Sequence, residues 1–483
     1  MIYDIKDIVG YGRSYPPKEE IKRLDGYRVN ALLMDDEAWS AMPEYTDRVK
    51  NILANFAIPD QDVYLYSANY WSDLVAKTQE LTYGEPPEIA VENKDELVAD
   101  ILTKTEFIEK AKEGCADFVG LGDWVTKIVE DEEGNKTFIN VNPATWFPVV
   151  SRENIKDIKA HVLSWVVTVT SKRYELHVQI HEKGSYTNKA FKLENYNPDS
   201  YYTVAQTNQR INIPTYDIGS ELSESAIDGF NLGTFETGLD DFAIVASANN
   251  PGTRRICGVS DFDNITSAVM EYCVRMTLKG IVLDKHSAPK MFGAPLVGDG
   301  TGMGNYLEVP PGGTTPNYLV WDASMQAVEN TIYGLKDDIA NLSGMGSLLS
   351  SKTFGESQGY DALMIKLAPA LMRAAGKKVV LEKHIKKLIH LLSKNYGEEI
   401  LEKDISVMWH DGIPATESVK ADIAQKHLNT GWSQRRVLMQ DYGFDENTAD
   451  EIVEERRLET PAIPSFGVDE EDYTGDDGDK PTE

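Results

Sequence analysis

The segment Gly346–Thr353, GSLLSSKT, comes close to a known chemical motif. It matches the phosphate-binding pattern GxxxxGK[ST], with Lys352 as the lysine, except that Ser351 stands where the second glycine should be. Such a loop needs glycines so that backbone N–H groups can wrap a phosphate. It also needs a strand in front of it and a helix behind it. A nucleotide site and a loop that happens to contain a lysine are the two interpretations to compare.

The residues around this segment argue against a nucleotide site. Ser351 would have to adopt a backbone geometry that glycine adopts at little cost. The residues before it, 324–342, follow a helical pattern, and no apolar run ending in Asp follows at a parallel-strand position. No GxSxG, HExxH or CxxC pattern occurs. We therefore expect no catalytic residues, no cofactor and no enzymatic activity.

The cysteines and histidines do not have the spacing of a metal site either. The three cysteines lie far apart without CxxC spacing, at Cys115, Cys257 and Cys273. This spacing argues against a disulfide framework and against a zinc site. His177 and His181 are four residues apart, but they stand in an alternating strand pattern with no partner ligands nearby, so we expect no metal there. Asp240 and Asp241 are interpreted as solvated turn charges.

Composition limits the partners of the chain. The 483 residues carry a formal net charge of −30, which disfavours non-specific binding to nucleic-acid phosphates. No stretch approaches 18 uncharged apolar residues, and the N-terminus lacks a signal-peptide layout, so we expect a cytoplasmic product without a membrane segment. The tail Gly467–Glu483 holds eight acidic residues and one lysine, and we expect it to be disordered.

One segment has the opposite charge. Tyr360–Lys394 contains eight lysines and arginines but only two acidic residues. A basic helix inside an acidic protein favours packing against acidic neighbours, and contact with DNA is the alternative. The same segment predicts a long helix over 359–393, which Pro369 should kink.

The other elements divide the chain by their periodicity. Residues 63–81 and 94–116 each predict a helix, whereas alternating patterns from Asp117 to about Asn250 predict antiparallel sheet, with two strands around an EEGN turn. Ile405–Trp409 predicts a strand. Helices follow over 415–458, with a break at 429–431 and Ser433 as a cap.

Two predicted helices enclose a small lobe. The first begins after Gly258, with Ser260 as its cap, and the lobe Ser287–Asp322 is rich in glycine and proline but contains strand-like runs. The second helix has an apolar stripe with alternating spacings of three and four: Met325, Val328, Ile332, Leu335, Ile339 and Leu342. So narrow a stripe suits packing against one neighbouring helix. The order predicts a lobe held away from the body on a helical stalk.

This order of parts resembles the portal proteins of tailed double-stranded DNA bacteriophages, of the siphovirus head-to-tail type. The resemblance rests on ELTYGEPPEI, GLGDWVTKIVEDEEGN with NVNPATWFPV, FAIVASANNPGTRRICGVSDFDNI, LSGMGSLLSSKTFGESQGYDALMIKLAPAL and HLNTGWSQRRVLMQDYGFDENTADEIVEE. It implies an α+β portal fold. The implied parts are a wing (1–257), a first stem helix (258–286), a clip (287–322), a second stem helix (323–342), a tunnel loop (343–358), a kinked helix returning to the wing (359–412), a crown (413–460) and an acidic tail (461–483).

The resemblance also implies a function without chemistry of its own. Such a protein forms a ring, of twelve subunits, at one capsid vertex of the virion after assembly in the host cytoplasm. The ring conducts double-stranded DNA during packaging and ejection. Its implied partners are the terminase large subunit, a head-completion or neck adaptor, and the major capsid and scaffolding proteins. Another virion structural protein, from the neck or associated with the scaffold, and a nucleotide-dependent packaging enzyme are the alternatives.

Within this resemblance the residues introduced above take specific places. Ser350, Ser351, Lys352 and Thr353 would lie on the tunnel loop and face the channel, where Lys352 is the sole cation and contacts DNA lightly. The apolar stripe of residues 324–342 would pack against a neighbouring subunit of the ring.

Overall fold

The computed structural model describes residues 1–55, 64–130, 134–197, 201–203, 210–287, 291–292, 317–318, 325–349, 360–396, 398–410, 417–442, 444 and 446–459. The chain divides into two compact units, Met1–Gly412 and Ile413–Glu483. The first unit combines helices with antiparallel sheets, so the fold class is α+β, as predicted. In the part of the chain described here, no helix is long and apolar enough to cross a bilayer.

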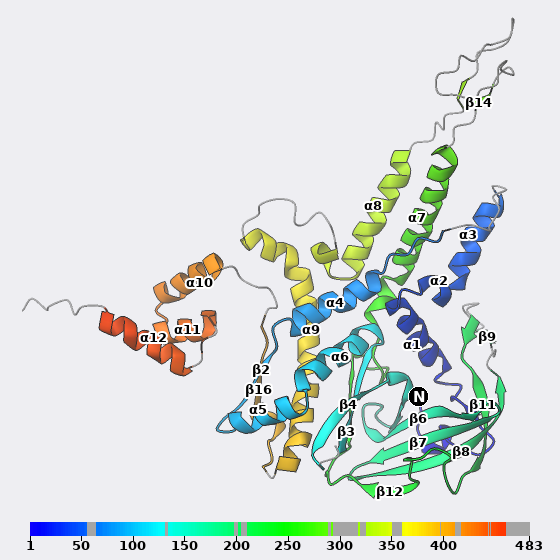
Figure 1. The fold of residues 1–483 in the computed structure, drawn as a ribbon, viewed down its shortest axis with the longest axis horizontal. Helices are drawn as coiled ribbons and strands as arrows, with labels where there is room; N and C mark the ends of the chain where they lie inside the picture. The colour runs from blue at the N-terminus through cyan, green and yellow to red at the C-terminus, as the bar shows by residue number, and fades with distance from the viewer. Residues whose placement is uncertain are drawn as a thin grey trace, which may run out of the picture. The chain divides into compact units, whose positions relative to one another are not determined.

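Helices dominate the N-terminal part of the first unit (Figure 1). They are α1 (Ile21–Met34), α2 (Ala38–Ala41), α3 (Pro43–Asn55), α4 (Tyr70–Tyr83), α5 (Asp95–Lys104) and α6 (Phe107–Gly120), after the 3-10 turn η1 (Ile5–Asp7). The helix predicted over 63–81 is α4, which begins only after Asn69 because the Asn69 side chain accepts from the backbone N–H of Ser72 and caps it. The single helix predicted over 94–116 is wrong. It is interrupted between α5 and α6, where Glu106 takes a left-handed φ of 51°.

The predicted β-rich region forms two main antiparallel sheets among the described residues. The larger has the order β1-β11-β8-β7-β6-β5, and β12 also pairs with β8. Its strands are β1 (Ser14–Tyr15), β5 (Trp146–Val150), β6 (Ile158–Thr170), β7 (Arg173–Glu182), β8 (Ser185–Asn197), β11 (Thr215–Glu221) and β12 (Gly233–Glu236). The smaller has the order β13-β3-β4, with β3 (Asp123–Glu130), β4 (Lys136–Val141) and β13 (Ile244–Ala248). The two strands predicted around the EEGN turn are β3 and β4. Shorter elements are η2 (Pro143–Thr145), β9 (Tyr201–Thr203) and β10 (Arg210–Asn212).

Two long helices form an antiparallel pair, which we call the stalk (Figure 1). The elements are η3 (Asp261–Asn264), α7 (Thr266–Ser287), β14 (Met291–Phe292), β15 (Asn317–Tyr318) and α8 (Met325–Leu342). Lys279 pairs with Glu329 at 3.2 Å, and Lys336 lies 5.6 Å from the ring centroid of Tyr272. The later residue of α7 contacts the earlier residue of α8, so the two helices run antiparallel and these two contacts fix their register. At the far end β14 pairs with β15, and the rest of the predicted lobe lies outside the described residues.

The helix predicted over 359–393 is α9 (Tyr360–Ser393), and it contains Pro369. Figure 1 shows α9 as a bent helix with a short first arm and a longer second arm. Proline explains a bend because it donates no backbone hydrogen bond and its ring clashes with the preceding turn. After α9 come η5 (Lys394–Tyr396), η6 (Glu402–Asp404) and β16 (Ile405–Met408), which pairs antiparallel with β2 (Glu88–Val91).

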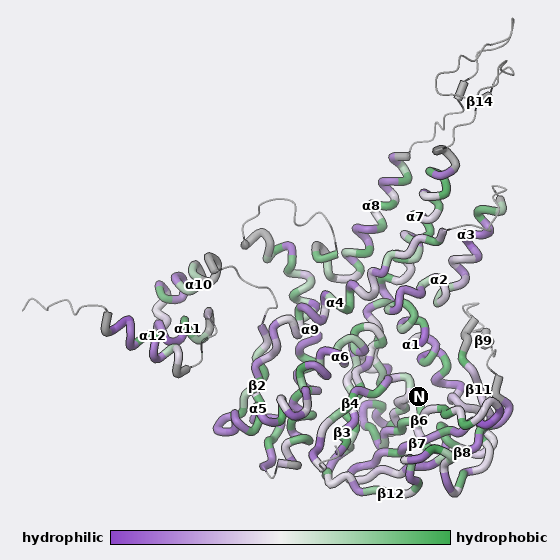
Figure 2. The backbone as a smooth tube through the Cα atoms, in the orientation of Figure 1, coloured by the Kyte–Doolittle hydropathy of each residue, from purple (hydrophilic) through white to green (hydrophobic). Residues whose placement is uncertain are grey.

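The main hydrophobic core joins these helices to the smaller sheet. Trp71 of α4, Phe118 of α6 and Trp124 of β3 are all fully buried in it, together with the inward-facing side chains of the second arm of α9. A second core lies between the larger sheet and α1. Figure 2 shows the hydrophobic residues along these helices alternating with hydrophilic ones, as expected for elements that each bury one face.

The second unit consists of three helices among its described residues: α10 (Glu417–Asn429), α11 (Gln434–Tyr442) and α12 (Glu446–Glu459). The predicted break between the first two is present, with Gly431 at a left-handed φ of 93°. The predicted cap is present too, because the hydroxyl of Ser433 accepts from the backbone N–H of Arg436 at 3.3 Å.

Candidate functional site

The predicted channel loop connects the stalk to α9. Ser350, Ser351, Lys352 and Thr353 all lie outside the described residues. The described chain reaches them through α8 and the 3-10 turn η4 (Gly346–Leu349), and it resumes at Tyr360. GSLLSSKT therefore follows a helix and begins with a 3-10 turn, whereas a phosphate-binding loop requires a strand in front of it.

The entrance to this loop is fixed by a short polar turn. Ser343 is buried, its hydroxyl donates to the carbonyl of Ala340 at 2.8 Å, and it accepts from the backbone N–H of Met345 at 3.1 Å. Gly344 has a φ of 68°, a left-handed conformation that ends α8 without strain. Met345 follows and is fully buried in the main core. The residues directly before the loop are therefore held in the main core.

The apolar stripe of α8 does not have the orientation predicted for it. Ile332 and Ile339 are 6% and 0% exposed within the single chain, and they belong to the same cluster as buried residues of α7. Val328 and Leu335 are half-buried against that cluster, whereas Leu342 is 48% exposed. The side chain of Met325, the first residue of α8, is not among those that the structure describes. The prediction that this stripe packs on a neighbouring subunit is therefore wrong at Ile332 and Ile339, because α7 of the same chain already covers that side of α8.

This correction changes what a mutation in the stripe should do. Ile332→Asp is expected to lower the free energy of unfolding of the subunit by about 3 kcal/mol or more, because it removes a buried side chain and buries a carboxylate. Leu342→Asp, in the same stripe but exposed, should change it by less than about 0.5 kcal/mol. Urea denaturation of the two variants measures the difference. Equal stabilities would show that α8 is not packed on α7.

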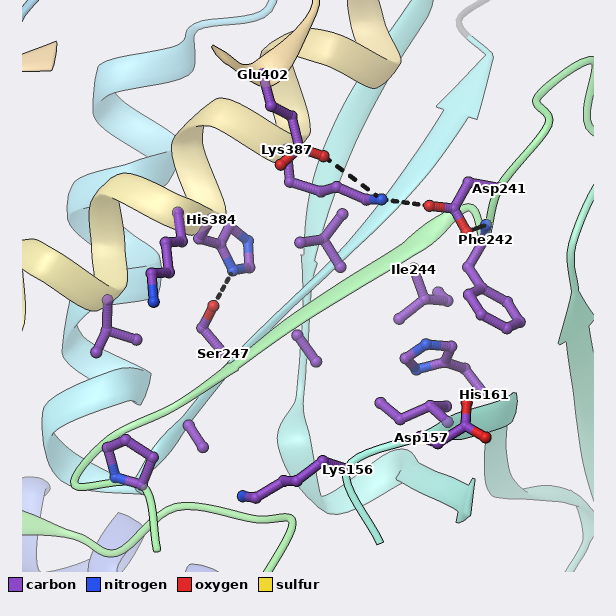
Figure 3. Close-up of a pocket in the computed structure, with 17 residues that line it drawn as sticks. Lys156, Asp157, His161, Asp241, Phe242, Ile244, Ser247, His384, Lys387 and Glu402 are labelled. Atoms are coloured by element: carbon purple, nitrogen blue, oxygen red, sulfur yellow. Dashed lines mark hydrogen bonds and ion pairs between the residues drawn. The ribbon is translucent and has the colours of Figure 1, made fainter. Parts of the chain in front are cut away.

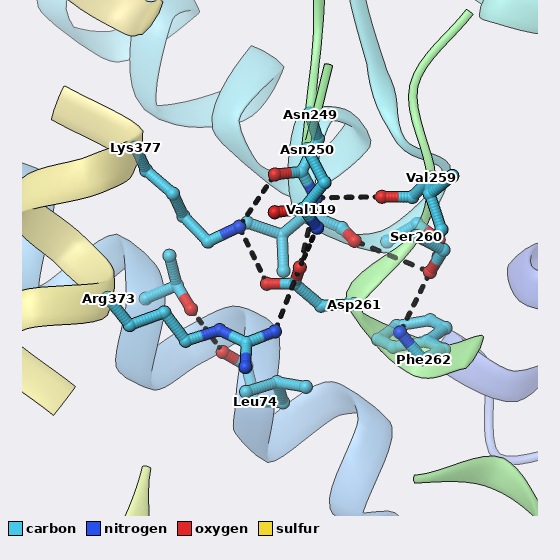
Figure 4. A network of polar contacts seen from close by, with 12 residues as sticks. Leu74, Val119, Asn249, Asn250, Val259, Ser260, Asp261, Phe262, Arg373 and Lys377 are labelled. Atoms are coloured by element: carbon cyan, nitrogen blue, oxygen red, sulfur yellow. Dashed lines mark hydrogen bonds and ion pairs between the residues drawn. The ribbon is translucent and has the colours of Figure 1, made fainter. Parts of the chain in front are cut away.

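A buried polar network ties α9 to the start of the stalk (Figure 4). Asp261, the first residue of η3, is fully buried. Its carboxylate lies 2.7 Å from Nζ of Lys377 and 3.0 Å from an Nη atom of Arg373. It also accepts from the side-chain amides of Asn249 and Asn250 at 3.0 and 3.1 Å. We call these five residues the Asp261 network.

Two cations face the one buried carboxylate of this network. Burial by itself raises the pKa of Asp261, but the neighbouring charges of Lys377 and Arg373 outweigh it and hold this pKa below its usual value. Burial lowers the pKa of Lys377, and the carboxylate of Asp261 opposes that effect. Asn249 is a second acceptor for Lys377, at 2.8 Å. Removing Asp261 would leave two neighbouring cations, one of them deeply buried, without their anion.

The segment Gly258–Asp261 positions this network. A Cβ on Gly258 would lie 1.8 Å from the carbonyl oxygen of Gly122, so glycine is required for the close approach of the two backbones. Ser260 donates to the carbonyl of Gly120 at 2.6 Å and accepts from the backbone N–H of Phe262 at 3.0 Å. It therefore caps η3, one short turn before α7, which is close to the capping role predicted for it.

Further cations of α9 and of the turn after it face acidic partners. Lys387 pairs with Asp241 and lies 3.7 Å from Glu402, and Lys394 of η5 pairs with Asp240. The prediction that the basic segment packs against acidic neighbours is confirmed at these positions. Asp240 is 74% exposed, as expected for a solvated turn charge. The same interpretation is wrong for Asp241, which is 23% exposed and binds Lys387 of α9.

A cavity of about 610 Å³ lies beside this helix, between α9, β13 and residues 156–161 (Figure 3). His384 lies at its wall, with Nδ1 2.9 Å from the hydroxyl of Ser247 and Nε2 3.1 Å from the hydroxyl of Thr126. Its ring stacks on Trp124, with the centroids 3.7 Å apart. Burial lowers the pKa of His384 to about 3. A serine and a histidine meet here, but the second ring nitrogen contacts a hydroxyl rather than the carboxylate that a catalytic triad places there.

The second histidine cluster has a similar character. Nε2 of His177 lies 3.3 Å from Glu175 and 3.1 Å from the hydroxyl of Ser225. Both partners share one ring nitrogen, so the histidine cannot relay a proton from serine to carboxylate across its ring. Glu175 also accepts from the backbone N–H of Ala226 at 3.2 Å, which fastens this loop to the sheet. In the described ranges, no group of three potential ligands has the geometry to hold a metal ion.

The matches to known proteins come from solved structures. No family model matches the chain. No curated protein matches it either. Among solved structures, one similar chain comes from the neck of a native gene transfer agent (GTA) particle computed with C12 symmetry. It has 11% sequence identity and a TM-score of 0.43, and the alignment covers 91% of this chain and 99% of that chain. Another comes from the virion of a native GTA particle, with 11% identity, a TM-score of 0.42, and coverage of 77% and 89%.

Proposed function

We propose that this chain is a portal protein, a subunit of a ring at one vertex of a phage-like capsid that conducts DNA in and out. The observation that carries the proposal is the order of parts: an antiparallel stalk that leaves and re-enters the body, a connecting loop, and a long bent helix anchored to the base of the stalk. In the resemblance described above, these parts correspond to the stem, tunnel loop and kinked helix.

The charge of the chain agrees with a conduit. With a net charge of −30, the protein neutralises few phosphates, so little counterion release holds the DNA in place. Arg373, Lys377 and Lys387 of α9 and Lys394, directly after it, are bound to acidic residues of the same chain. Lys352 on the loop is then the residue proposed to contact passing DNA, without reading its sequence. The proposed partners are the terminase large subunit, a neck adaptor, and capsid and scaffolding proteins.

Electron microscopy of the purified full-length protein tests the proposal. Closed rings with an axial hole, of twelve subunits, are the expected result. A monomer that forms no rings at any salt concentration would contradict the portal function and would favour another structural role in the virion.

Lys352→Ala separates a conduit from a nucleotide-driven enzyme. The portal function predicts that wild type and variant form the same rings and that neither hydrolyses ATP. Hydrolysis by the wild type that is lost in Lys352→Ala would favour the packaging-enzyme alternative. Ser347→Ala, in the same segment but outside the lysine position, is the matched control.

A further inference from the structure

An apolar stripe on α9 faces away from the core of its own subunit. Ile365, Met372 and Val379 are 75%, 76% and 57% exposed, and they are spaced seven residues apart. Ala375 and Gly376, which fall between the last two on the same face, are exposed as well. A Cβ on Gly376 would meet no atom within 4 Å. We call these five residues the α9 stripe.

The stripe is unusual for an exposed helical surface. The opposite face of α9 packs against its own subunit, with Leu367, Ala370, Ala374 and Leu381 almost completely buried. Apolar side chains at positions i, i+3, i+4 and i+7 form a continuous strip, and a soluble helix normally exposes polar residues along such a strip. A contiguous apolar surface of this kind marks a site where another surface packs. The small residues at its centre would let a second helix approach closely.

The charges beside the stripe indicate what kind of surface covers it. Lys366 and Lys383 are exposed along the stripe. Among the residues of α9 whose side chains are described, no acidic residue is exposed. Lys383 has no ion-pair partner among the described residues. A stripe pairing with its own copy would therefore bring cations together, which is unfavourable. The covering surface should instead be apolar and acidic.

The outer face of α8 has this character. Tyr333 is 52% exposed, and Asp337 and Asp338 are exposed one turn further along the helix. Neither aspartate has an ion-pair partner in the part of the chain that the structure describes. Tyr333 and Asp337 are four residues apart and lie on one side of the helix, the side turned away from buried Ile332 and Ile339.

We propose that the α9 stripe of one subunit packs against the outer face of α8 of a second copy of this chain, with Lys383 opposite Asp337 and Asp338. The proposal rests on the proposed ring function and names the surfaces that build it. Two different faces meet in this contact, so each subunit keeps one free face for a further copy. Such a head-to-tail contact closes into a ring when its rotation permits. The acidic tail Gly467–Glu483 fits less well, because it carries almost no apolar side chains to cover the stripe.

A charge placed in the stripe tests the contact. Met372→Glu in the full-length protein should weaken subunit association on the order of 100-fold and leave monomers, because it buries an unpaired carboxylate in the interface. Its circular dichroism should match the wild type, since the side chain is exposed in the single subunit. Met408→Glu is the matched control: Met408 is 54% exposed on β16, outside the stripe, and this variant should assemble normally. Size-exclusion chromatography with light scattering measures both.

Mixing two variants tests the pairing of the two faces. Tyr333→Glu blocks the α8 face and leaves the stripe intact, whereas Met372→Glu does the reverse. Each alone should be monomeric, and an equimolar mixture should form one-to-one pairs and no rings. If Met372→Glu forms rings, or if the mixture stays monomeric, this inference is overturned. The portal function still stands in either case, provided that the wild type forms rings. A wild type that forms no rings would overturn the portal function, and this inference with it.

Discussion

Asp261→Ala is expected to lower the free energy of unfolding of the first unit by about 3–5 kcal/mol. The substitution removes the carboxylate but leaves Lys377, which is 5% exposed, as a buried cation facing Arg373 without an anion between them. The side-chain amides of Asn249 and Asn250 lose their acceptor as well. Urea denaturation followed by tryptophan fluorescence measures the loss, because Trp71 and Trp124 are buried in the same unit.

A surface carboxylate with similar partners provides the control. Glu271 pairs with Arg48 and Arg275, but its side chain is 24% exposed and both arginines are 44% exposed. Glu271→Ala should therefore cost no more than about 1 kcal/mol. The double variant Asp261→Leu/Lys377→Met should recover part of the stability, because it removes both buried charges together. Equal losses for Asp261→Ala and Glu271→Ala would show that the network contributes nothing beyond a surface ion pair.

The long helices and the main strands could be predicted because their signals are local. The periodicity of 360–393 places α9 within one residue of its observed start, and Ser260 and Ser433 cap helical segments as predicted. Glu106 shows the limit of this approach. Its left-handed backbone separates α5 from α6 within a continuous helical pattern, and no glycine or proline marks the position.

The faces that these helices bury could not be predicted in the same way. The stripe of α8 signals that some helix covers it, but periodicity does not say whether that helix belongs to the same chain, and α7 turns out to cover Ile332 and Ile339. The α9 stripe was hidden because α9 is apolar on two sides, so that buried Leu381 and exposed Val379 look alike in the sequence. The Asp261 network joins residues more than a hundred positions apart. Its only sequence signal is a pair of cations four residues apart, and Lys383 and Lys387 of the same basic helix have the same spacing.

Acid is expected to unfold the first unit at a higher pH than its carboxylates alone would require. Three of the almost completely buried histidines have strongly lowered pKa values: His161, His181 and His384. Burial lowers the pKa of His161 to about 4, and those of His181 and His384 to about 3. The unfolded chain binds protons at these rings below about pH 6.5, whereas the folded chain does not until about pH 3–4. Each ring therefore removes about 1.4 kcal/mol of stability for every pH unit below 6.5.

Buried carboxyl groups act in the opposite direction, because burial raises the pKa of Asp117, Asp123 and Asp263. The pKa of Asp117 rises to about 6, so the folded protein binds this proton more readily than the unfolded chain between about pH 6 and pH 4. The gain from Asp117 offsets about one of the three histidines, so these four groups together give a net loss of roughly 3 kcal/mol per pH unit in that interval. Asp261, whose pKa is held low, adds a further loss below about pH 4. Denaturation in urea at a series of pH values between 7 and 4 measures this slope.

Removing one buried ring tests the assignment. His384→Gln should reduce the slope between pH 6 and pH 4 by about 1.4 kcal/mol per pH unit, because glutamine does not titrate, even though it lowers stability at pH 7 by disturbing the contact with Trp124. The change in slope therefore separates the titration from the packing loss. His410→Gln makes the same substitution at an exposed side chain and is the matched control. Parallel curves for wild type and His384→Gln would mean that His384 takes up its proton equally well in the folded chain, so that burial does not govern the acid sensitivity of this protein.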